Sequence, residues 1–92
     1  MHPTNPVIAA IKKLPAQPGV YIFKDADQHI IYVGKAKDLK KRVISYVLLQ
    51  GKDVKADTIM NTAASLEHLL TESELEAMLL EAQLIQQLRY NN

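Results

Sequence analysis

The chain has 92 residues, 48% of them hydrophobic, and a formal net charge of +1, so it has the size of one small domain with a modest core. It contains no cysteine, which excludes disulfides and thiolate metal sites and is typical of a reducing cytoplasm. It has neither an apolar run near the ~20 residues of a membrane span nor the apolar core of a secretory signal peptide. We therefore expect a single cytoplasmic domain over residues 1–92, with a flexible start over 1–6 and no membrane partner.

The first part of the chain predicts a helix followed by a β-hairpin. Apolar residues at helical spacing predict a helix over 6–13. Alternation of period two then predicts strands over 19–24 and 29–34. A turn centred between residues 26 and 27 would pair Tyr21 directly with Tyr32, so that both side chains share one face of the sheet. On strand propensity alone, two half-buried core tyrosines are the more ordinary interpretation.

A basic segment follows the hairpin. It holds five of the eleven basic residues: Lys35, Lys37, Lys40, Lys41 and Arg42. Asp38 predicts the N-cap of a helix over 39–49. Arg42 lies one turn into that helix, where its guanidinium and the positive helix start both suit a phosphate oxygen. Gly34 ends the second strand at a point where a side chain would crowd an approaching backbone.

The second part of the chain predicts two further helices and a short strand. Apolar spacing predicts a helix over 54–64, with Lys55 on its solvent-exposed face. Residues 66–70 are consistent with a third strand or with a continuation of that helix, and periodicity does not decide between them. Ser73 followed by Glu76 forms a capping box that begins the last helix.

That last helix is predicted over 74–88. Its expected buried stripe consists of Leu75, Met78, Leu79, Ala82, Ile85 and Leu88. Glu81 lies at the edge of this stripe, and an acid beside core residues costs free energy unless a cation or a metal compensates it. An ion pair with Arg42 or Lys35 is the ordinary explanation. Beside the hairpin we favour a metal ligand, because a single carboxylate suits Mg²⁺, which keeps much of its hydration.

Four sequence features, in this order, resemble the GIY-YIG nuclease family: GVY at 19–21, YVGK at 32–35, Arg42, and SELEAMLLEAQLI at 73–85. Within that family the chain is most similar to the N-terminal domain of the excinuclease C type, and the resemblance covers residues 11–89. It implies an α/β (α+β) domain with a small three-stranded, mostly antiparallel sheet flanked by helices. It also supports the third strand over 66–70.

The resemblance implies a DNA endonuclease that depends on one divalent metal, Mg²⁺ or Mn²⁺. By likeness to the family, Glu81 would be the metal ligand and Tyr32 the general base or the orienter of the attacking water. Tyr21 would position the water or the phosphate, and Arg42 would neutralise the developing charge. Because a free phenol has a pKa near 10, Tyr32 would need Lys35 or the metal nearby to form a phenolate. The basic residues of 35–42 would bind DNA.

The C-terminus departs from the family, whose domain usually ends LIKKxRPxYN with an asparagine that helps to build the site. Here the run is LIQQLRYNN, so Asn91 corresponds to that asparagine only if two residues have been deleted. The leading interpretation is 3′ incision in nucleotide excision repair, with damage-recognition subunits as partners if the chain is part of a longer protein. The alternatives are a free-standing GIY-YIG nuclease and a non-catalytic DNA-binding or protein-interaction module.

Overall fold

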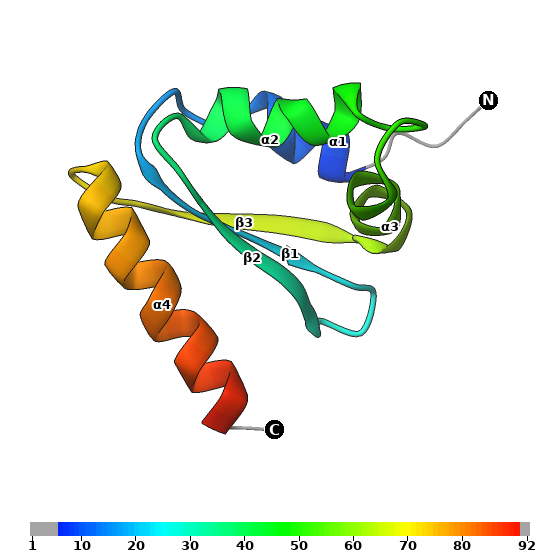
Figure 1. Cartoon of the computed structure of the whole chain (residues 1–92). Coiled ribbons are helices and arrows are strands. Elements are labelled where there is room, and N and C mark those ends of the chain that lie inside the picture. Colours follow the sequence, from blue (N-terminus) through cyan, green and yellow to red (C-terminus); the bar gives the residue numbers. More distant parts are fainter. Residues whose placement is uncertain (1–5, 91–92) are drawn as a thin grey trace.

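The computed structural model describes residues 6–90, which form a three-stranded sheet between two layers of helices (Figure 1). In chain order the elements are α1 (Pro6–Lys12), β1 (Gly19–Lys24), β2 (Ile30–Ala36), α2 (Leu39–Leu48), α3 (Val54–Thr62), β3 (Ser65–Leu70) and α4 (Glu74–Tyr90). Every predicted helix and strand is present, including the third strand that periodicity left open. The second strand continues to Ala36, beyond its predicted end at residue 34. Within residues 6–90, no helix combines the length and the apolar character needed to cross a membrane.

The sheet has the strand order β2-β1-β3, and both pairings are antiparallel. Alternate residues of β1 point into two separate cores. Tyr21 and Phe23 pack with residues of α1, α2 and α3. Val20 and Ile22 pack against α4, which lies on the other side of the sheet (Figure 1). The central strand is therefore buried on both faces, and it fixes the two helical layers relative to each other.

The predicted register of the hairpin is wrong by two residues. Tyr21 pairs with Gly34 and Phe23 pairs with Tyr32, with an irregularity after Phe23. Because side chains alternate with period two, a shift of two residues leaves each of them on its predicted face. The rings of Tyr21 and Tyr32 therefore still share one face, with their centroids 6.1 Å apart.

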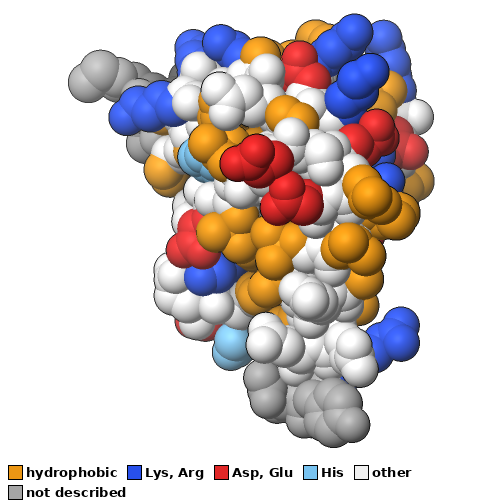
Figure 2. Space-filling view, turned by 90° about the vertical axis from the view of Figure 1, so that its left-hand side faces the viewer, with side chains coloured by type: hydrophobic (Ala, Val, Ile, Leu, Met, Phe, Trp, Pro, Cys, Tyr) orange, Lys and Arg blue, Asp and Glu red, His pale blue; other side chains and the backbone are white. Residues whose placement is uncertain are grey.

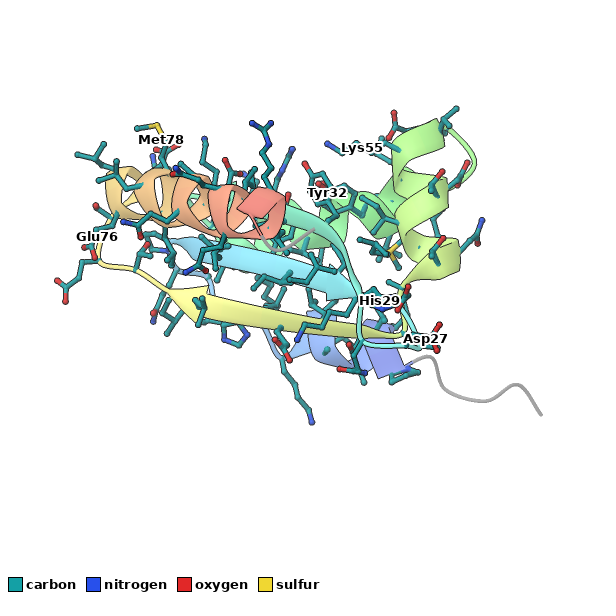
Figure 3. The ribbon with its side chains drawn as sticks, turned by 90° about the horizontal axis from the view of Figure 1, so that it is seen from below. Asp27, His29, Tyr32, Lys55, Glu76 and Met78 are labelled. Atoms are coloured by element: carbon teal, nitrogen blue, oxygen red, sulfur yellow. The ribbon has the colours of Figure 1, made fainter. Side chains whose placement is uncertain are left out.

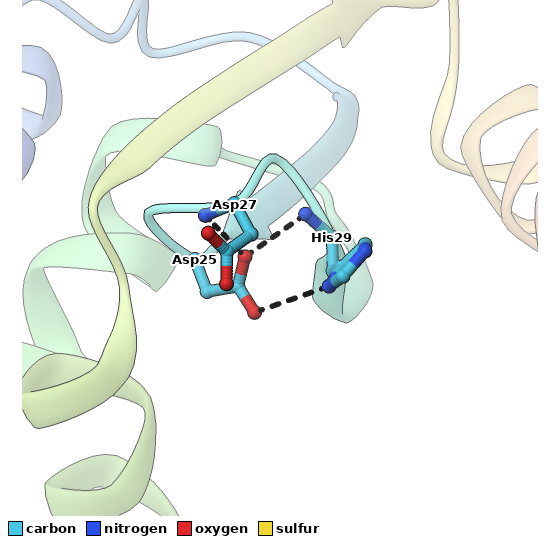
Figure 4. Close-up of polar contacts among 3 residues, drawn as sticks. All are labelled: Asp25, Asp27 and His29. Atoms are coloured by element: carbon cyan, nitrogen blue, oxygen red, sulfur yellow. Dashed lines mark hydrogen bonds and ion pairs between the residues drawn. The ribbon is translucent and has the colours of Figure 1, made fainter.

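The turn between β1 and β2 explains this shift. The Asp25 carboxylate accepts hydrogen bonds of 2.9 Å from the backbone N–H groups of Asp27 and His29 (Figure 4). Gln28 adopts a left-handed conformation with φ of 68°. A side chain that bonds the following backbone in this way stabilises a longer turn than two central residues would give. The longer turn displaces the pairing that symmetry about residues 26 and 27 had predicted.

Both predicted N-caps form. The Asp38 carboxylate accepts a hydrogen bond of 3.0 Å from the Lys41 N–H at the start of α2. Ser73 Oγ accepts one of 3.1 Å from the Glu76 N–H at the start of α4. The reciprocal half of the capping box differs, because the Glu76 carboxylate accepts from the Glu72 N–H at 3.3 Å.

The predicted buried stripe of α4 is partly wrong. Ala77 is fully buried against the sheet, and the half-buried residues around it are Leu80, Leu84, Ile85 and Leu88. Leu75, Met78, Leu79 and Ala82 are exposed instead. Figure 2 shows hydrophobic side chains on the side of the molecule where α4 begins. Apolar residues surround this helix almost completely, so its spacing alone does not select one face. Glu81 lies four residues after Ala77, on the side that faces the sheet.

Candidate active site

A pocket of about 920 Å³ lies where β2, the start of α2 and α4 meet, and it collects the predicted catalytic residues. The residues that line it include Tyr21, Tyr32, Gly34, Lys35, Arg42 and Glu81. Five of these residues come from the consecutive elements β1, β2 and α2, whereas Glu81 comes from α4, which is distant in the sequence. The approach of Glu81 to the others therefore follows from the fold and not from local spacing.

The pocket is built on a cluster of aromatic rings. The centroids of Tyr21, Tyr32 and Tyr46 lie 5.9 to 6.3 Å apart in every pairing, and Phe23 packs edge-on beneath them. The hydroxyl groups of Tyr21 and Tyr46 are hydrogen-bonded at 2.7 Å within the core. Tyr46 is therefore a further member of the site, which the sequence analysis did not single out. Its position four residues after Arg42, on the same face of a helix, was the available signal.

Gly34 provides the space that the Tyr21 ring occupies. A Cβ atom at this position would overlap the ring and hydroxyl of Tyr21, its direct partner across the sheet. The predicted reason for this glycine, close approach of another backbone, therefore differs from what the structure shows. The absent side chain admits an aromatic ring, which places the Tyr21 hydroxyl at the pocket.

Lys55 contacts one of the pocket tyrosines, Tyr32, from α3. Its Nζ donates a hydrogen bond of 2.7 Å to the Tyr32 hydroxyl and lies 4.3 Å from the centroid of that ring (Figure 3). The prediction that Lys55 belongs to a solvent-exposed face accounts for its exposure but missed this contact. Lys35, the predicted neighbour of Tyr32, lines the pocket from the other face of β2. No local pattern pairs residues 32 and 55, because the contact depends on how α3 is placed.

The three tyrosines occupy different electrostatic environments. Burial raises the pKa of Tyr46, and its hydrogen bond with Tyr21 raises it further. Burial also raises the pKa of Tyr21, against the lowering effect of its hydrogen bonds with Tyr46 and Arg42. Burial raises the pKa of Tyr32 as well, but hydrogen bonds from Lys55 and Tyr46 and the nearby positive charges bring it below the ordinary 10.0. Tyr32 is therefore the phenol of this cluster that ionises most readily.

Arg42 contacts this aromatic cluster and also lines the pocket. Its guanidinium carbon lies 5.7 Å from the centroid of the Tyr46 ring. The hydrogen bond with Tyr21, followed by the charge interaction with that phenol, raises the pKa of Arg42. The guanidinium is therefore positively charged throughout the physiological range and is anchored at one side, while its exposed part faces the pocket.

Glu81 is half-buried in the pocket wall. Among the ion pairs of residues 6–90, none involves Glu81, so the ordinary explanation of a pair with Arg42 or Lys35 does not hold. An uncompensated carboxylate beside an open pocket is suited to a divalent cation, which accepts oxygen ligands and retains water. Glu74, in the first turn of α4, also lines the pocket.

The predicted DNA-binding residues separate into two groups. Lys35, Lys37, Lys41 and Arg42 line the pocket, whereas Lys40 is exposed outside it. Asn91, the candidate for the family's terminal asparagine, lies outside the described residues, and its role stays a prediction.

The sequence matches one protein family across most of its length. The model of the UvrC-like GIY-YIG domain matches residues 17–92. The UvrABC system protein C of Hydrogenovibrio crunogenus is 46% identical over 85 residues, which cover 90% of this chain and 14% of that protein. Its counterpart from Methanosarcina mazei is 47% identical over 83 residues, which cover 88% of this chain and 16% of that protein. The chain thus spans about one seventh of the length of the curated relatives it matches.

Solved structures match over nearly their whole length. The N-terminal GIY-YIG endonuclease domain of UvrC from Thermotoga maritima, bound to magnesium as its catalytic divalent cation, is 41% identical with a TM-score of 0.80. The match covers 89% of this chain and 89% of that one. A form of the same domain with an asparagine replaced by alanine, also bound to its catalytic divalent cation, matches with a TM-score of 0.80 and 41% identity. That match covers 89% of this chain and 88% of that one.

Proposed function

The chain belongs to the UvrC-like GIY-YIG family and is an endonuclease domain of that type, and on that premise we propose that its pocket hydrolyses one phosphodiester bond of DNA. The observation that carries this proposal is the convergence of the two motif tyrosines, Arg42 and Glu81 on one open pocket. A non-catalytic module that kept the fold would not need these four side chains together.

Tyr32 is the proposed general base. It is only half-buried, it lines the pocket, and its pKa lies below the ordinary value. Its phenolate accepts a proton from a water while that water's oxygen forms a bond to phosphorus. The bond from phosphorus to the leaving oxygen breaks, and its electron pair stays on that oxygen, which takes a proton from solvent. Tyr21 is almost fully buried, so we assign it the positioning of the attacking water or of a phosphate oxygen.

Negative charge that develops on the phosphate is neutralised by fixed cations. Arg42 lies against the Tyr46 ring, with its guanidinium carbon 5.7 Å from the ring centroid, and presents planar donors that match a phosphate. Lys35 adds a second positive charge from β2. These groups are in place before the reaction, so they need no reorganisation when the charge develops.

Glu81 is the proposed ligand of one divalent cation, Mg²⁺ or Mn²⁺. The residues fit this role, because the carboxylate is half-buried, lines an open pocket and has no ion-pair partner among residues 6–90. Such a cation, when bound, supplies positive charge next to the phosphate oxygens. The magnesium ion bound to the Thermotoga maritima domain supports a divalent cation as the cofactor, whereas the choice of Glu81 as its ligand rests on the pocket geometry.

The biological setting is proposed from the relatives. Because they are subunits of the UvrABC system, we propose that this domain makes the 3′ incision of nucleotide excision repair in the cytoplasm. Damage-recognition subunits would then deliver the DNA. The test is whether the purified recognition subunits direct its cuts to a single lesion. Cuts that ignore the lesion would favour a free-standing nuclease instead.

Nicking of a supercoiled plasmid tests the nuclease function. We would compare Mg²⁺, Mn²⁺ and chelator for the wild-type protein, for Glu81→Gln, and for Glu72→Gln as a matched loss of one exposed carboxylate. We expect metal-dependent nicking that Glu81→Gln lowers by about 10²-fold or more and that Glu72→Gln leaves unchanged. Wild-type nicking by Glu81→Gln would overturn the ligand assignment. Absence of nicking with either metal, even with the recognition subunits present, would refute the nuclease function.

A further inference from the structure

Lys55 lies outside the pocket but contacts its most readily ionised phenol. It stands in the first turn of α3, which begins after the break at Gly51 and packs on α2. Its Nζ is 2.7 Å from the Tyr32 hydroxyl and lies over the ring at 4.3 Å from the centroid. The ammonium thus contacts the oxygen and the π face of one residue. An ammonium that served only for solubility would not be expected to make both contacts, because holding a long side chain in place costs conformational entropy.

We propose that Lys55 is a positioning residue of the nuclease reaction, which fixes the Tyr32 hydroxyl and stabilises its phenolate form. This inference rests on the proposed function, in which Tyr32 takes the proton of the attacking water. An ammonium donates hydrogen bonds and accepts none, so its bond to Tyr32 becomes stronger when the phenol loses its proton. Lys55 supplies this stabilisation from α3 and is not among the residues that line the pocket.

The other charged and titratable groups around Tyr32 do not replace Lys55. Tyr46 and Arg42 approach from α2, and Tyr21 approaches from β1. Arg42 is engaged with Tyr21, and its influence on Tyr32 is the smallest of those that lower the pKa. Tyr21 and Tyr46 are neutral phenols whose pKa values are raised. Among the cations of residues 6–90, Lys55 is the one that donates a direct hydrogen bond to the Tyr32 hydroxyl.

Titration of the tyrosines without DNA tests the contact itself. Near-ultraviolet absorbance of tyrosinate would be followed against pH for the wild-type protein, Lys55→Met and Lys52→Met, with Tyr32→Phe used to assign the Tyr32 component. Lys52 is an exposed lysine just before the same helix, with no side-chain contact recorded in residues 6–90, and it controls for loss of one charge. We expect the Tyr32 midpoint to move to higher pH in Lys55→Met and to stay in place in Lys52→Met. An unmoved midpoint in a folded Lys55→Met protein would overturn the inference.

The pH profile of single-turnover nicking tests the role in the reaction. Ionised Tyr32 increases as pH rises, so the rising limb of the profile should move to higher pH in Lys55→Met. The rate should fall by about tenfold at neutral pH and approach the wild-type rate at high pH. Lys55→Arg, which keeps the charge, should restore most of the loss. A purely structural role would lower the rate equally at every pH.

These experiments separate this inference from the function on which it rests. A shifted Tyr32 titration with an unshifted nicking profile would overturn the role of Lys55 in the reaction. A wild-type protein that never nicks DNA would refute the proposed function, whereas the titration would still report whether Lys55 acts on Tyr32. Lys55 is exposed, so its replacement should leave the domain folded. Lys55→Gln provides a second variant, which replaces the ammonium by a shorter, uncharged amide.

Discussion

Replacing Gly34 with alanine tests how the aromatic cluster is packed. The added Cβ would lie within 3.0 Å of three atoms of Tyr21, and real Cβ atoms essentially never approach so closely. The ring cannot simply move aside, because it is only 1% exposed and contacts Phe23 and Tyr46 at centroid distances of 5.9 Å each. Its hydroxyl is also held by Tyr46 at 2.7 Å. We therefore expect Gly34→Ala to displace the ring and to break that hydrogen bond.

The magnitude follows from three contributions. Overpacking a tight core costs about 1–3 kcal/mol. Loss of the Tyr21–Tyr46 hydrogen bond adds about 1 kcal/mol. Alanine recovers about 0.4–1 kcal/mol by restricting the unfolded chain, with no backbone strain to set against it, since Gly34 does not have a positive φ. The net expectation is a loss of about 1–3.5 kcal/mol in the free energy of unfolding, with a central value of about 2 kcal/mol.

Urea denaturation measures this loss. With a slope of about 1 kcal/mol per molar urea for so small a domain, the midpoint should fall by about 2 M. Gly51→Ala is the matched control, because the added Cβ at that position would meet open space. Its φ of 82° should cost about 1 kcal/mol of backbone strain, and we expect no loss of nicking. In a Tyr21→Leu background the extra cost of Gly34→Ala should largely disappear. Wild-type stability of Gly34→Ala, or an equal cost in the Tyr21→Leu background, would refute the packing argument.

Two further substitutions examine the hydrogen-bonded cluster. Tyr46→Phe should lower the free energy of unfolding, measured by urea denaturation, by about 1 kcal/mol, because it leaves the buried Tyr21 hydroxyl without its hydrogen-bond partner. Strictly additive effects of Tyr21→Phe and Tyr46→Phe in the double variant would show that the two hydroxyls do not interact. Arg42→Lys should slow nicking by at least about tenfold while the free energy of unfolding changes by about 0.5 kcal/mol or less, because the charge remains but the planar donors are lost. An unchanged single-turnover rate would exclude Arg42 from charge stabilisation.

Local signals in the sequence were sufficient to predict the helices and the two hairpin strands, whereas the third strand was predicted only through the family resemblance. Asp38 and Ser73 mark helix starts through side-chain bonds to the backbone a few residues on, and such caps are readable without a fold. The face of the sheet on which the two hairpin tyrosines lie was also predicted correctly, although the register of the strands was not. A register error of two residues leaves each side chain on its predicted face of the sheet. Tyr21 and Tyr32 were therefore correctly predicted to share a face, although they are not directly paired.

The parts that the sequence did not predict depend on tertiary placement. The contact between Lys55 and Tyr32 joins α3 to β2, and no periodicity connects those elements. The buried face of α4 was misassigned because leucine and methionine occur nearly all round that helix. The sequence nevertheless singled out Glu81 as an unusual acid, since a charge beside apolar positions is conspicuous whichever of them are buried. The structure places Glu81 half-buried in the pocket wall.

The distribution of charge indicates what the pocket can recognise. Lys35, Lys37, Lys41 and Arg42 line it, but so do Asp38, Glu74 and Glu81. At most four phosphates could be neutralised here, and each would contribute about 0.9 to the slope of log affinity against log salt. A site with so few cations and opposing acids is suited to hold one phosphate firmly rather than a long stretch of backbone. Affinity for a particular place on DNA must then come from surfaces beyond this pocket, which is the role that damage-recognition partners would have.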